Sequence, residues 1–310
     1  MKKTPWWVWA IGAAVIVTAI AGALFLGRDT ADGPGSEGPS SGETPGAEST
    51  SSAEPTATLP DEDGSAGEPA EPGKPQTVRL YFGRGEKLGV VSRQVPVTKA
   101  VATTAMQQLL LGPTGTEKGW GFTSEVPVGT DLLGLSIADG TANVDLSGEF
   151  ASGGGTLSVS MRLAQVVFTL TQFSTVDRVV FRMDGTTVGI FTGEGVMLDG
   201  PQTRADYEDV VPALLVEGPT PGDTVTSPVR IWGTGNTFEA AFMVRIEDPD
   251  GATLIEKPGM ATSGTGTRGT FDITVPFDTA ATGMGTIVVY ESSAKDGSPI
   301  NVVEIPVKLQ

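Results

Sequence analysis

The sequence contains no cysteine and no histidine. Without cysteine the chain can form no disulfide, no thiolate zinc site and no cysteine-linked lipid anchor. Without histidine it lacks the usual general base at neutral pH and the commonest metal ligand, which excludes a Ser-His-Asp hydrolase. We therefore expect no enzyme activity, no metal and no cofactor; a histidine-free hydrolase is the catalytic alternative.

Positive charge is also scarce. The chain has 20 Lys and Arg against 37 Asp and Glu, a formal net charge of −17, and no basic cluster offsets it. Such a surface repels phosphate backbones and anionic lipid surfaces. The sequence therefore excludes nucleic acid as a partner.

One long uncharged run is present near the start of the chain. Trp6 to Gly27 is 22 residues long and follows Lys2 and Lys3. As a helix it would measure about 33 Å, enough to cross a bilayer core of about 30 Å. By the positive-inside rule, residues 1–27 are predicted to be a cytoplasmic stub and a single-pass anchor in the cell membrane, with the bulk of the chain extracytoplasmic.

A cleaved signal peptide is the competing interpretation of the same run. Ala19-Ile20-Ala21 and Ala21-Gly22-Ala23 both resemble small-residue cleavage sites. The apolar run continues through Leu24-Phe25-Leu26, beyond either site. A retained anchor fits this length better, and both alternatives export the rest of the chain.

Residues 28–75 are rich in Gly, Pro, Ser, Thr, Asp and Glu, and Leu59 is their one large apolar residue. Such a composition buries too little apolar surface to offset the entropy of ordering. The segment is predicted to be a disordered acidic linker. A docking or glycosylation segment is the alternative, although no motif supports it.

An α+β domain is predicted for residues 76–195. Strand-like runs at 78–82 and 90–97 precede a helical period at 100–111, which Gly112-Pro113 ends. A hairpin is expected at 131–137 and 141–146 around Asp139-Gly140, and a helix at 156–173. A second hairpin, 178–183 with 187–191, completes what we expect to be two helices packed on one mixed sheet.

Short strands without helical period follow an interdomain segment at 196–212. Turn signals such as Asp248-Pro249-Asp250-Gly251 separate them, and Trp232 and Phe242 are predicted core residues. This pattern predicts an all-β immunoglobulin-like sandwich over 213–310. The expected strands are 213–217, 228–234, 239–247, 252–256, 269–276, 285–292 and 301–309.

The first of these domains resembles the GerMN domain of sporulation and spore germination proteins. The matching stretches, in the family's order, are LYF (80–82), LLLGP (109–113), VPVGTDLL (126–133), ADGTANVDLSGEF (138–150), LAQVVFTLTQF (163–173) and VVFRMDG (179–185). The second resembles the immunoglobulin-like domain that often follows it. Its matching stretches are GPTPGDTVTSPVRIWGTGNTFEAAF (218–242), DPDG (248–251) and VVYESSAKDG (288–297).

The resemblance implies an extracytoplasmic, membrane-attached protein of the bacterial cell envelope, related to sporulation or germination and without known chemistry. Similar folds build rings, so self-association through the GerMN-like domain is implied. Many relatives are lipoproteins attached through a cysteine, which this chain lacks, so attachment is expected through residues 6–27. The function we expect is protein interaction and assembly; a binding module for cell-wall glycan or peptide is the alternative.

Several residue groups are candidate sites with a structural alternative. Ser152–Thr156 precedes a helix and is either an anion site or a flexible helix entry, with Thr156 or Ser158 as N-cap. Glu247–Gly251 is a calcium loop or a turn. Asp139, Asp145 and Glu149 are glycosidase acids or solvated turn residues.

Two aromatic residues, Trp120 and Phe122, lie outside any predicted element in the Gly-rich stretch 115–125. They either form a small core beneath the loop or a patch that faces a partner. They are the one candidate partner site among the predicted site residues. The expected partners are envelope proteins, the cell wall and a second copy of the chain.

Overall fold

The computed structural model describes residues 75–191, 196–278 and 282–310. The predicted anchor at 6–27 and all but the last residue of the predicted linker lie outside the described residues. Within the described ranges, no helix has the length and apolar character needed to cross a bilayer.

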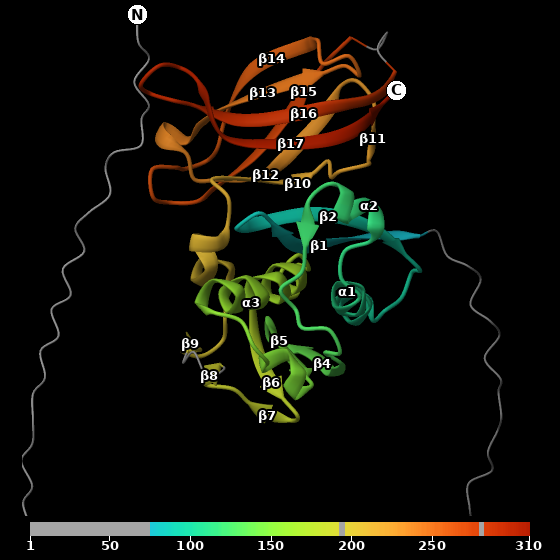
Figure 1. Ribbon diagram of the computed structural model, residues 1–310, viewed down its shortest axis with the longest axis vertical. Helices are drawn as coiled ribbons and strands as arrows, with labels where there is room; N and C mark the ends of the chain where they lie inside the picture. The colour runs from blue at the N-terminus through green and yellow to red at the C-terminus, as the bar shows by residue number, and fades with distance from the viewer. Residues whose placement is uncertain (1–74, 192–195, 279–281) are drawn as a thin grey trace, which may run out of the picture. The chain divides into compact units, whose positions relative to one another are not determined.

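In the described residues, the first domain contains two larger β-sheets, the two-stranded sheet β8-β9 and three α-helices (Figure 1). Its elements in chain order are β1 (Gln76–Arg84), β2 (Lys87–Val95), α1 (Val101–Leu110), α2 (Gly115–Gly119), β3 (Phe122–Thr123), β4 (Leu132–Ala138), β5 (Thr141–Leu146), the 3₁₀ turn η1 (Gly148–Ala151), α3 (Thr156–Leu170), β6 (Arg178–Met183), β7 (Thr186–Thr187), β8 (Ile190–Phe191), β9 (Val196–Met197) and the 3₁₀ segment η2 (Arg204–Val210). The α+β class predicted from the sequence is confirmed.

The two sheets differ in strand direction. One is antiparallel, in the order β2-β1-β3. The other is mixed, in the order β4-β5-β6-β7, with β5 and β6 parallel and joined through α3. The predicted β4–β5 hairpin is confirmed: Asp139 and Gly140 both have positive φ, at 50° and 73°, as a tight two-residue turn requires.

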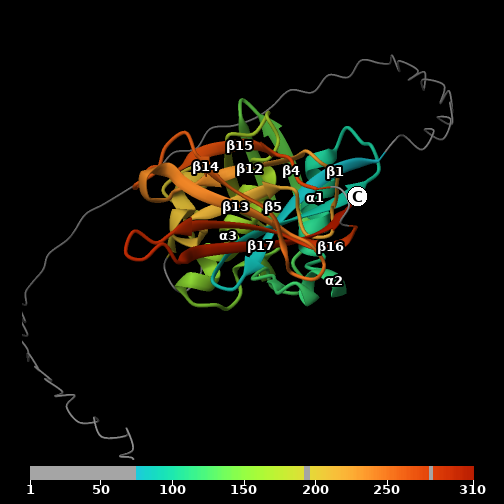
Figure 2. The ribbon, with the colours of Figure 1, turned by 90° about the horizontal axis from the view of Figure 1, so that it is seen from above.

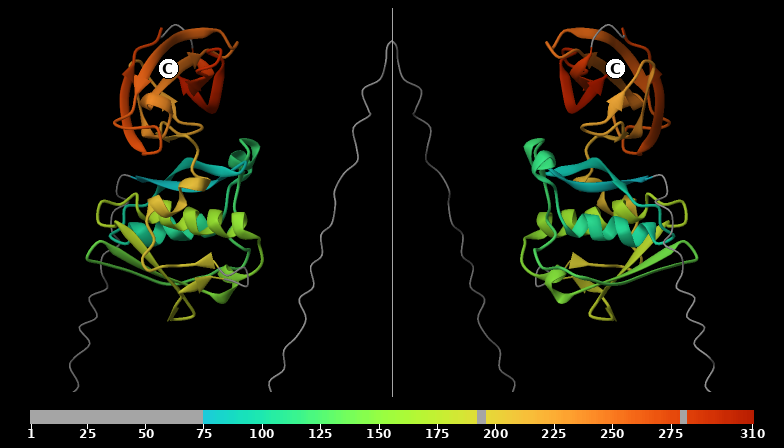
Figure 3. Two further views of the ribbon diagram at one scale, coloured as in Figure 1. Left: turned by 90° about the vertical axis from the view of Figure 1, so that its left-hand side faces the viewer. Right: turned by 90° about the vertical axis from the view of Figure 1, so that its right-hand side faces the viewer.

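Helices α1 and α3 lie between the two larger sheets, as Figure 3 shows. The prediction of two helices packed on one mixed sheet is therefore wrong in its layering. The reason is visible in α3, where all residues from Met161 to Leu170 are buried. A helix covered on both sides buries its polar positions too, and the sequence period identified only the apolar face.

Two local predictions need correction. The N-cap of α3 is Gly155, not Thr156 or Ser158, and the Ser158 hydroxyl donates to Glu125 Oε2 at 2.6 Å. The predicted hairpin after 178–183 forms but is shorter than expected: β7 pairs with β6 over two residues only, and Phe191 lies in the core within β8, which pairs with β9.

The second domain is a sandwich of a three-stranded and a five-stranded sheet; Figure 2 shows its strands in orange and red. The sheets have the orders β10-β12-β15 and β11-β17-β16-β13-β14. Its elements are β10 (Leu214–Gly218), β11 (Thr224–Val225), β12 (Val229–Gly235), η3 (Phe238–Ala240), β13 (Ala241–Glu247), β14 (Thr253–Met260), β15 (Gly269–Val275), β16 (Gly283–Ser292) and β17 (Pro299–Leu309).

Of the two aromatic residues predicted for the sandwich core, only one lies there. Phe242 is 2% exposed and its ring centroid lies 4.7 Å from that of Phe271 on the facing sheet. Trp232 is not a core residue, because residues alternate between the two faces of a strand and Ile231 occupies the core face of β12. Trp232 lies on the outer face, where the guanidinium of Arg79 stacks on it at 4.7 Å.

Candidate functional site

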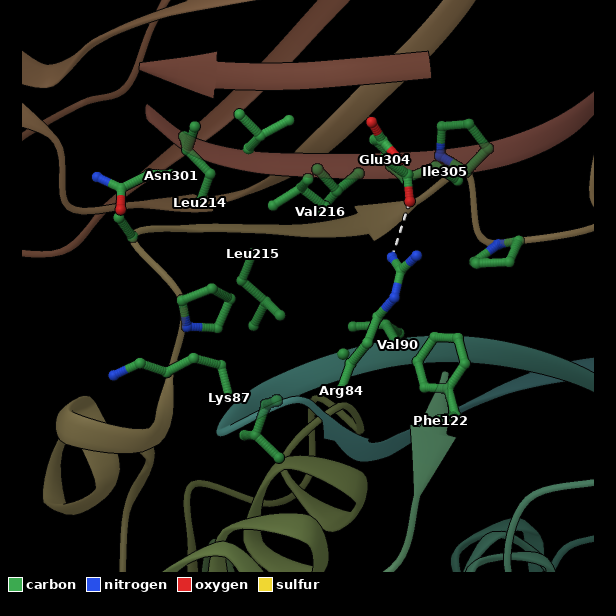
Figure 4. A pocket seen from close by; sticks show the side chains of 18 residues that line it. Arg84, Lys87, Val90, Phe122, Leu214, Leu215, Val216, Asn301, Glu304 and Ile305 are labelled. Carbon is green, nitrogen blue, oxygen red and sulfur yellow. Dashed lines mark hydrogen bonds between the residues drawn. The ribbon is translucent and has the colours of Figure 1, made fainter. Parts of the chain in front are cut away.

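A pocket of about 540 Å³ lies where the β1–β2 hairpin meets β10 and β17 (Figure 4). Most of its lining side chains are apolar. They are Leu88, Val90, Phe122, Pro212, Ala213, Leu214, Leu215, Val216, Pro219, Pro221, Val302, Val303 and Ile305. An apolar concavity of this size with a few polar groups is the usual form of a binding site.

Strand β10 forms one wall and contributes to both domains. Its side chains alternate, so Leu214 and Val216 pack in the core of the sandwich while Leu215, 2% exposed, packs in the core of the first domain. Strand β10 pairs with β12, and a Cβ on Gly233 of β12 would lie 2.1 Å from the Leu215 carbonyl oxygen. Glycine is therefore required at that position.

Two cations lie at the pocket. The Arg84 guanidinium donates to the Glu304 carbonyl oxygen at 2.7 Å and to the Trp120 carbonyl oxygen at 3.2 Å. Lys87 Nζ donates to the carbonyl oxygen of Asp209 at 2.5 Å. Burial lowers the pKa of Arg84, and nearby Glu304 opposes that shift. These groups orient backbone and present positive charge; they do not form an acid–base pair.

A buried polar network joins the domains beside the pocket. The Tyr81 hydroxyl donates to Glu217 Oε1 at 2.5 Å, and Arg204 Nη1 donates to the same oxygen at 2.6 Å. Burial raises the pKa of Tyr81, and the charge of Arg204 partly opposes the rise. The phenol therefore remains a neutral hydrogen-bond donor, and one carboxylate holds a strand from each domain and the connecting η2 segment together.

A second, shallower pocket of about 330 Å³ lies on the other side of β10. Arg79, Trp232 and Arg230 line it, together with hydroxyls from Thr77, Ser92 and Thr224. Arg79 Nε is buried and has no hydrogen-bond partner, although the guanidinium stacks on Trp232. An unpartnered guanidinium nitrogen next to hydroxyl groups can bind a carboxylate, and two acids, Glu217 and Asp223, also line the pocket.

Of the predicted aromatic pair Trp120 and Phe122, only Phe122 lines the first pocket, and both are mostly covered from within the chain. Phe122 is 2% exposed and belongs to the core of the first domain. Trp120 is half-buried against Gly222, where a Cβ would lie 2.7 Å from the indole. Gly222 also has a φ of +89°, so glycine suits both the turn and the contact.

The acidic candidates hold up turns and strands: Asp145 lies in β5 and Glu149 in η1. Asp139 sits in the β4–β5 turn, and Asp145 Oδ1 accepts the Gly185 N–H at 3.0 Å. Hydrogen bonding from Ser147 lowers the pKa of the exposed Glu149. In Glu247–Gly251, Asp248 Oδ1 accepts the N–H groups of Asp250 and Ala252, which is the geometry of a turn. Within the described ranges, no group of three or more acidic residues is placed to hold a metal.

Arg162 holds the loop at 152–156, and the sequence did not identify it as a site residue. Arg162, 3% exposed, donates to the carbonyl oxygens of Glu125, Phe150 and Gly153. These bonds satisfy a buried guanidinium and fix the loop before α3. A charged residue within an otherwise apolar helical period was the available signal.

The residues around the first pocket were missed for a different reason. Arg84, Leu215 and Glu304 come from three distant parts of the sequence, and each looks ordinary in its own strand. Only the packing of β10 against the β1–β2 hairpin brings them together. The signal that existed was indirect: β17 has apolar residues at both odd and even positions, which is unusual for a strand with one solvated face.

Two family models match the chain. Residues 79–189 match Germane, described as sporulation and spore germination, and residues 213–298 match Gmad2, the immunoglobulin-like domain of bacterial spore germination. The chain combines these two domains. Both resemblances stated from the sequence are thereby confirmed, and the Germane and Gmad2 domains meet at the pocket and the polar network.

Several solved structures contain chains that are similar to this one. The first GerMN domain of the sporulation protein GerM from Bacillus subtilis is 26% identical, with 42% of this chain and 99% of that chain covered and a TM-score of 0.35. A presumed lipoprotein from Clostridium perfringens is 19% identical over 44% and 93%, with a TM-score of 0.33. The tandem GerMN domains of GerM are 20% identical over 66% and 62%, with a TM-score of 0.36. The comparison with curated proteins found no match.

Proposed function

We propose that this chain is a membrane-anchored, extracytoplasmic protein of the bacterial cell envelope that acts by protein–protein association in a process related to sporulation or germination. It performs no chemistry in this role. Its Germane and Gmad2 domains present a jointly built binding surface to envelope proteins, and the Germane domain contributes self-association.

The observation that carries this proposal is the joining of the two domains. Leu215 of the second domain is a core residue of the first. Glu217, in the same strand as Leu215, accepts hydrogen bonds from Tyr81 and Arg204 of the first domain. Burial of a strand's side chain in a neighbouring domain resists independent motion of the two. A fixed arrangement of two binding modules suits an assembly role.

The absence of the usual catalytic groups supports a role without chemistry. The whole chain has neither histidine nor cysteine. At the candidate site the charged groups are Arg84, Lys87 and Glu304, and the two cations are engaged with carbonyl oxygens. These groups suit recognition of a partner more than proton transfer.

Fractionation and photo-crosslinking in the native host test the proposal. The full chain is expected in the membrane fraction. Protease added outside the cytoplasmic membrane is expected to digest it. A photo-crosslinking residue at exposed Leu133 of the Germane domain should yield adducts with envelope proteins or a second copy. A variant lacking residues 6–27 should leave the membrane fraction.

The matched position for crosslinking is Met284, an exposed residue of the second domain. Adducts with a second copy at Leu133 that are absent at Met284 would assign self-association to the Germane domain. A chain that is protected from external protease and recovered without any envelope adduct at either position would refute the proposed function.

A cell-wall glycan or peptide is the second candidate ligand, and the shallower pocket favours it. Trp232 and the unpartnered Arg79 Nε lie there among hydroxyl groups, a setting suited to a ligand that carries a carboxylate. Co-sedimentation of the full chain with purified peptidoglycan tests this function. Arg79→Gln should reduce the bound fraction, whereas equal sedimentation of the two proteins would reject it.

A further inference from the structure

The edge of β17 is covered by a neighbouring strand only near its end, and it is open at the Glu304 N–H beside the first pocket. β17 is 11 residues long, and the neighbouring strand on its outer side, β11, pairs only with Lys308 and Leu309. Residues 301–305 of β17 line the pocket instead (Figure 4). An uncovered strand edge is a template for another strand.

The hydrogen bonds of β17 show which backbone groups face the pocket side. Glu304 O accepts from Arg84, Pro306 O accepts from the Gly222 N–H at 2.8 Å, and Lys308 N–H donates to Asp223 O at 2.8 Å. In an antiparallel pair, backbone groups alternate toward and away from the neighbouring strand. Even-numbered residues of this stretch therefore point away from β16.

This alternation leaves one backbone donor of β17, the Glu304 N–H, free for a partner. The Glu304 N–H points away from β16, and no hydrogen bond to another described residue engages it. The side chains of Ile300 and Val302 on the same strand are 41% and 46% exposed. The edge thus combines a free donor with apolar side chains that water does not stabilise.

The surroundings define what would occupy the edge. The other walls of the pocket, from β2 and β10, are apolar, and two of its three charged lining residues are the cations Arg84 and Lys87. An extended apolar segment fits such walls, and acidic flanks complement the two cations.

We propose that a partner protein binds here by adding an extended apolar segment with acidic flanks as a strand along the edge of β17. This inference rests on the proposed assembly function and names its contact. The incoming strand lies in the pocket, accepts a hydrogen bond from the Glu304 N–H, and continues the line that β11 begins. The partly exposed lining residues Pro212, Ala213 and Val302 contact its apolar side chains.

Selection of displayed random peptides against the full chain in nanodiscs tests the proposal. Enriched peptides should be apolar with acidic flanks, and a scan that replaces one peptide C=O at a time by CH2 should weaken binding at the position that accepts the Glu304 N–H. Glu304→Pro removes the free donor and, like the natural Pro306, sits at an outward-facing position of the ladder. It should weaken the selected peptide about ten-fold, the equivalent of about 1.4 kcal/mol.

Two controls separate the edge from other effects. Glu304→Gln removes the charge but keeps the N–H, and should bind the peptide as the wild type does. Met260→Pro places the same substitution on β14, the other edge strand of this sheet, where Ala261 N–H pairs with Ala240 O and Met260 faces outward. It too should leave affinity unchanged, with thermal unfolding confirming that each variant folds.

Failure to enrich any peptide, or equal affinity for Glu304→Pro and the wild type, would overturn the proposal. A concentration-dependent dimer that Glu304→Pro abolishes would also overturn it, because the occupant would then be a second copy. The proposed function fails separately. If Glu304→Pro retains every envelope adduct of the wild type, the assembly role stands and the β17 edge is not its contact.

Discussion

At the scale of single residues, buried charge in this protein is held by several hydrogen bonds at once. Arg93 donates to both oxygens of Glu117, at 3.1 and 2.6 Å, and to the carbonyl oxygen of Gly112. Glu117 also caps its own helix, because its Oε2 accepts the Thr114 N–H. Burial alone would raise the pKa of Glu117, but hydrogen bonds from Arg93 and Thr114 outweigh it and lower the pKa below its ordinary value of 4.5.

This shift gives the first prediction at residue scale. A carboxylate with a lowered pKa in the folded state stabilises the fold above pH 4.5, and the contribution is lost as pH falls through the folded-state pKa. Glu117→Gln should therefore lower the free energy of unfolding by about 2 kcal/mol at neutral pH. The difference from the wild type should shrink in acid.

Urea unfolding at pH 7 and pH 3 measures both quantities. Glu86→Gln is the matched control, because Glu86 is an exposed acid in the β1–β2 turn and its loss should change stability little at either pH. An undiminished difference between Glu117→Gln and the wild type at pH 3 would contradict the assigned charge interaction.

At the scale of elements, strand β10 links the two hydrophobic cores. Leu215→Ala should destabilise the Germane domain by about 2–5 kcal/mol, since it removes a buried side chain from that core. Val216→Ala, one residue further on, removes a side chain from the sandwich core instead. Hydrogen exchange of the amides distinguishes the two cores.

The expected pattern is reciprocal. Leu215→Ala should lower protection in α3 and β1, whereas Val216→Ala should lower protection in β16. If both variants loosen only the sandwich, β10 belongs to the second domain alone.

At the scale of the whole described molecule, the buried network around Glu217 couples the domains. Tyr81→Phe deletes the donor from β1 and leaves the carboxylate with Arg204. The wild type should show one unfolding transition by circular dichroism and by tryptophan fluorescence. The variant should show two, because the domains lose a buried contact worth about 1–2 kcal/mol.

Tyr290→Phe provides the comparison for that experiment. The Tyr290 hydroxyl also donates to a carboxylate, Glu256, but both residues belong to the second domain. This variant should lower the stability of the sandwich and keep the transitions coincident to the degree seen in the wild type. Separate transitions in Tyr290→Phe, or coincident ones in Tyr81→Phe, would argue against the network as the coupling element.

The sequence by itself determined the elements that depend on local chemistry. Asp139-Gly140 fixed a hairpin because a tight turn needs positive φ, and Gly112 ended α1 with a φ of +71° for the same reason. Turn signals between short runs placed the predicted sandwich strands within a few positions, because such residues favour tight turns.

Tertiary structure decided what those elements meet. The sequence could not show that a second sheet covers α3, that Trp232 faces Arg79 instead of the core, or that β10 serves both domains. These outcomes depend on contacts between residues far apart in the chain, and no local period records them. The pocket and the free edge of β17 arise from the same contacts, so only the folded molecule reveals them.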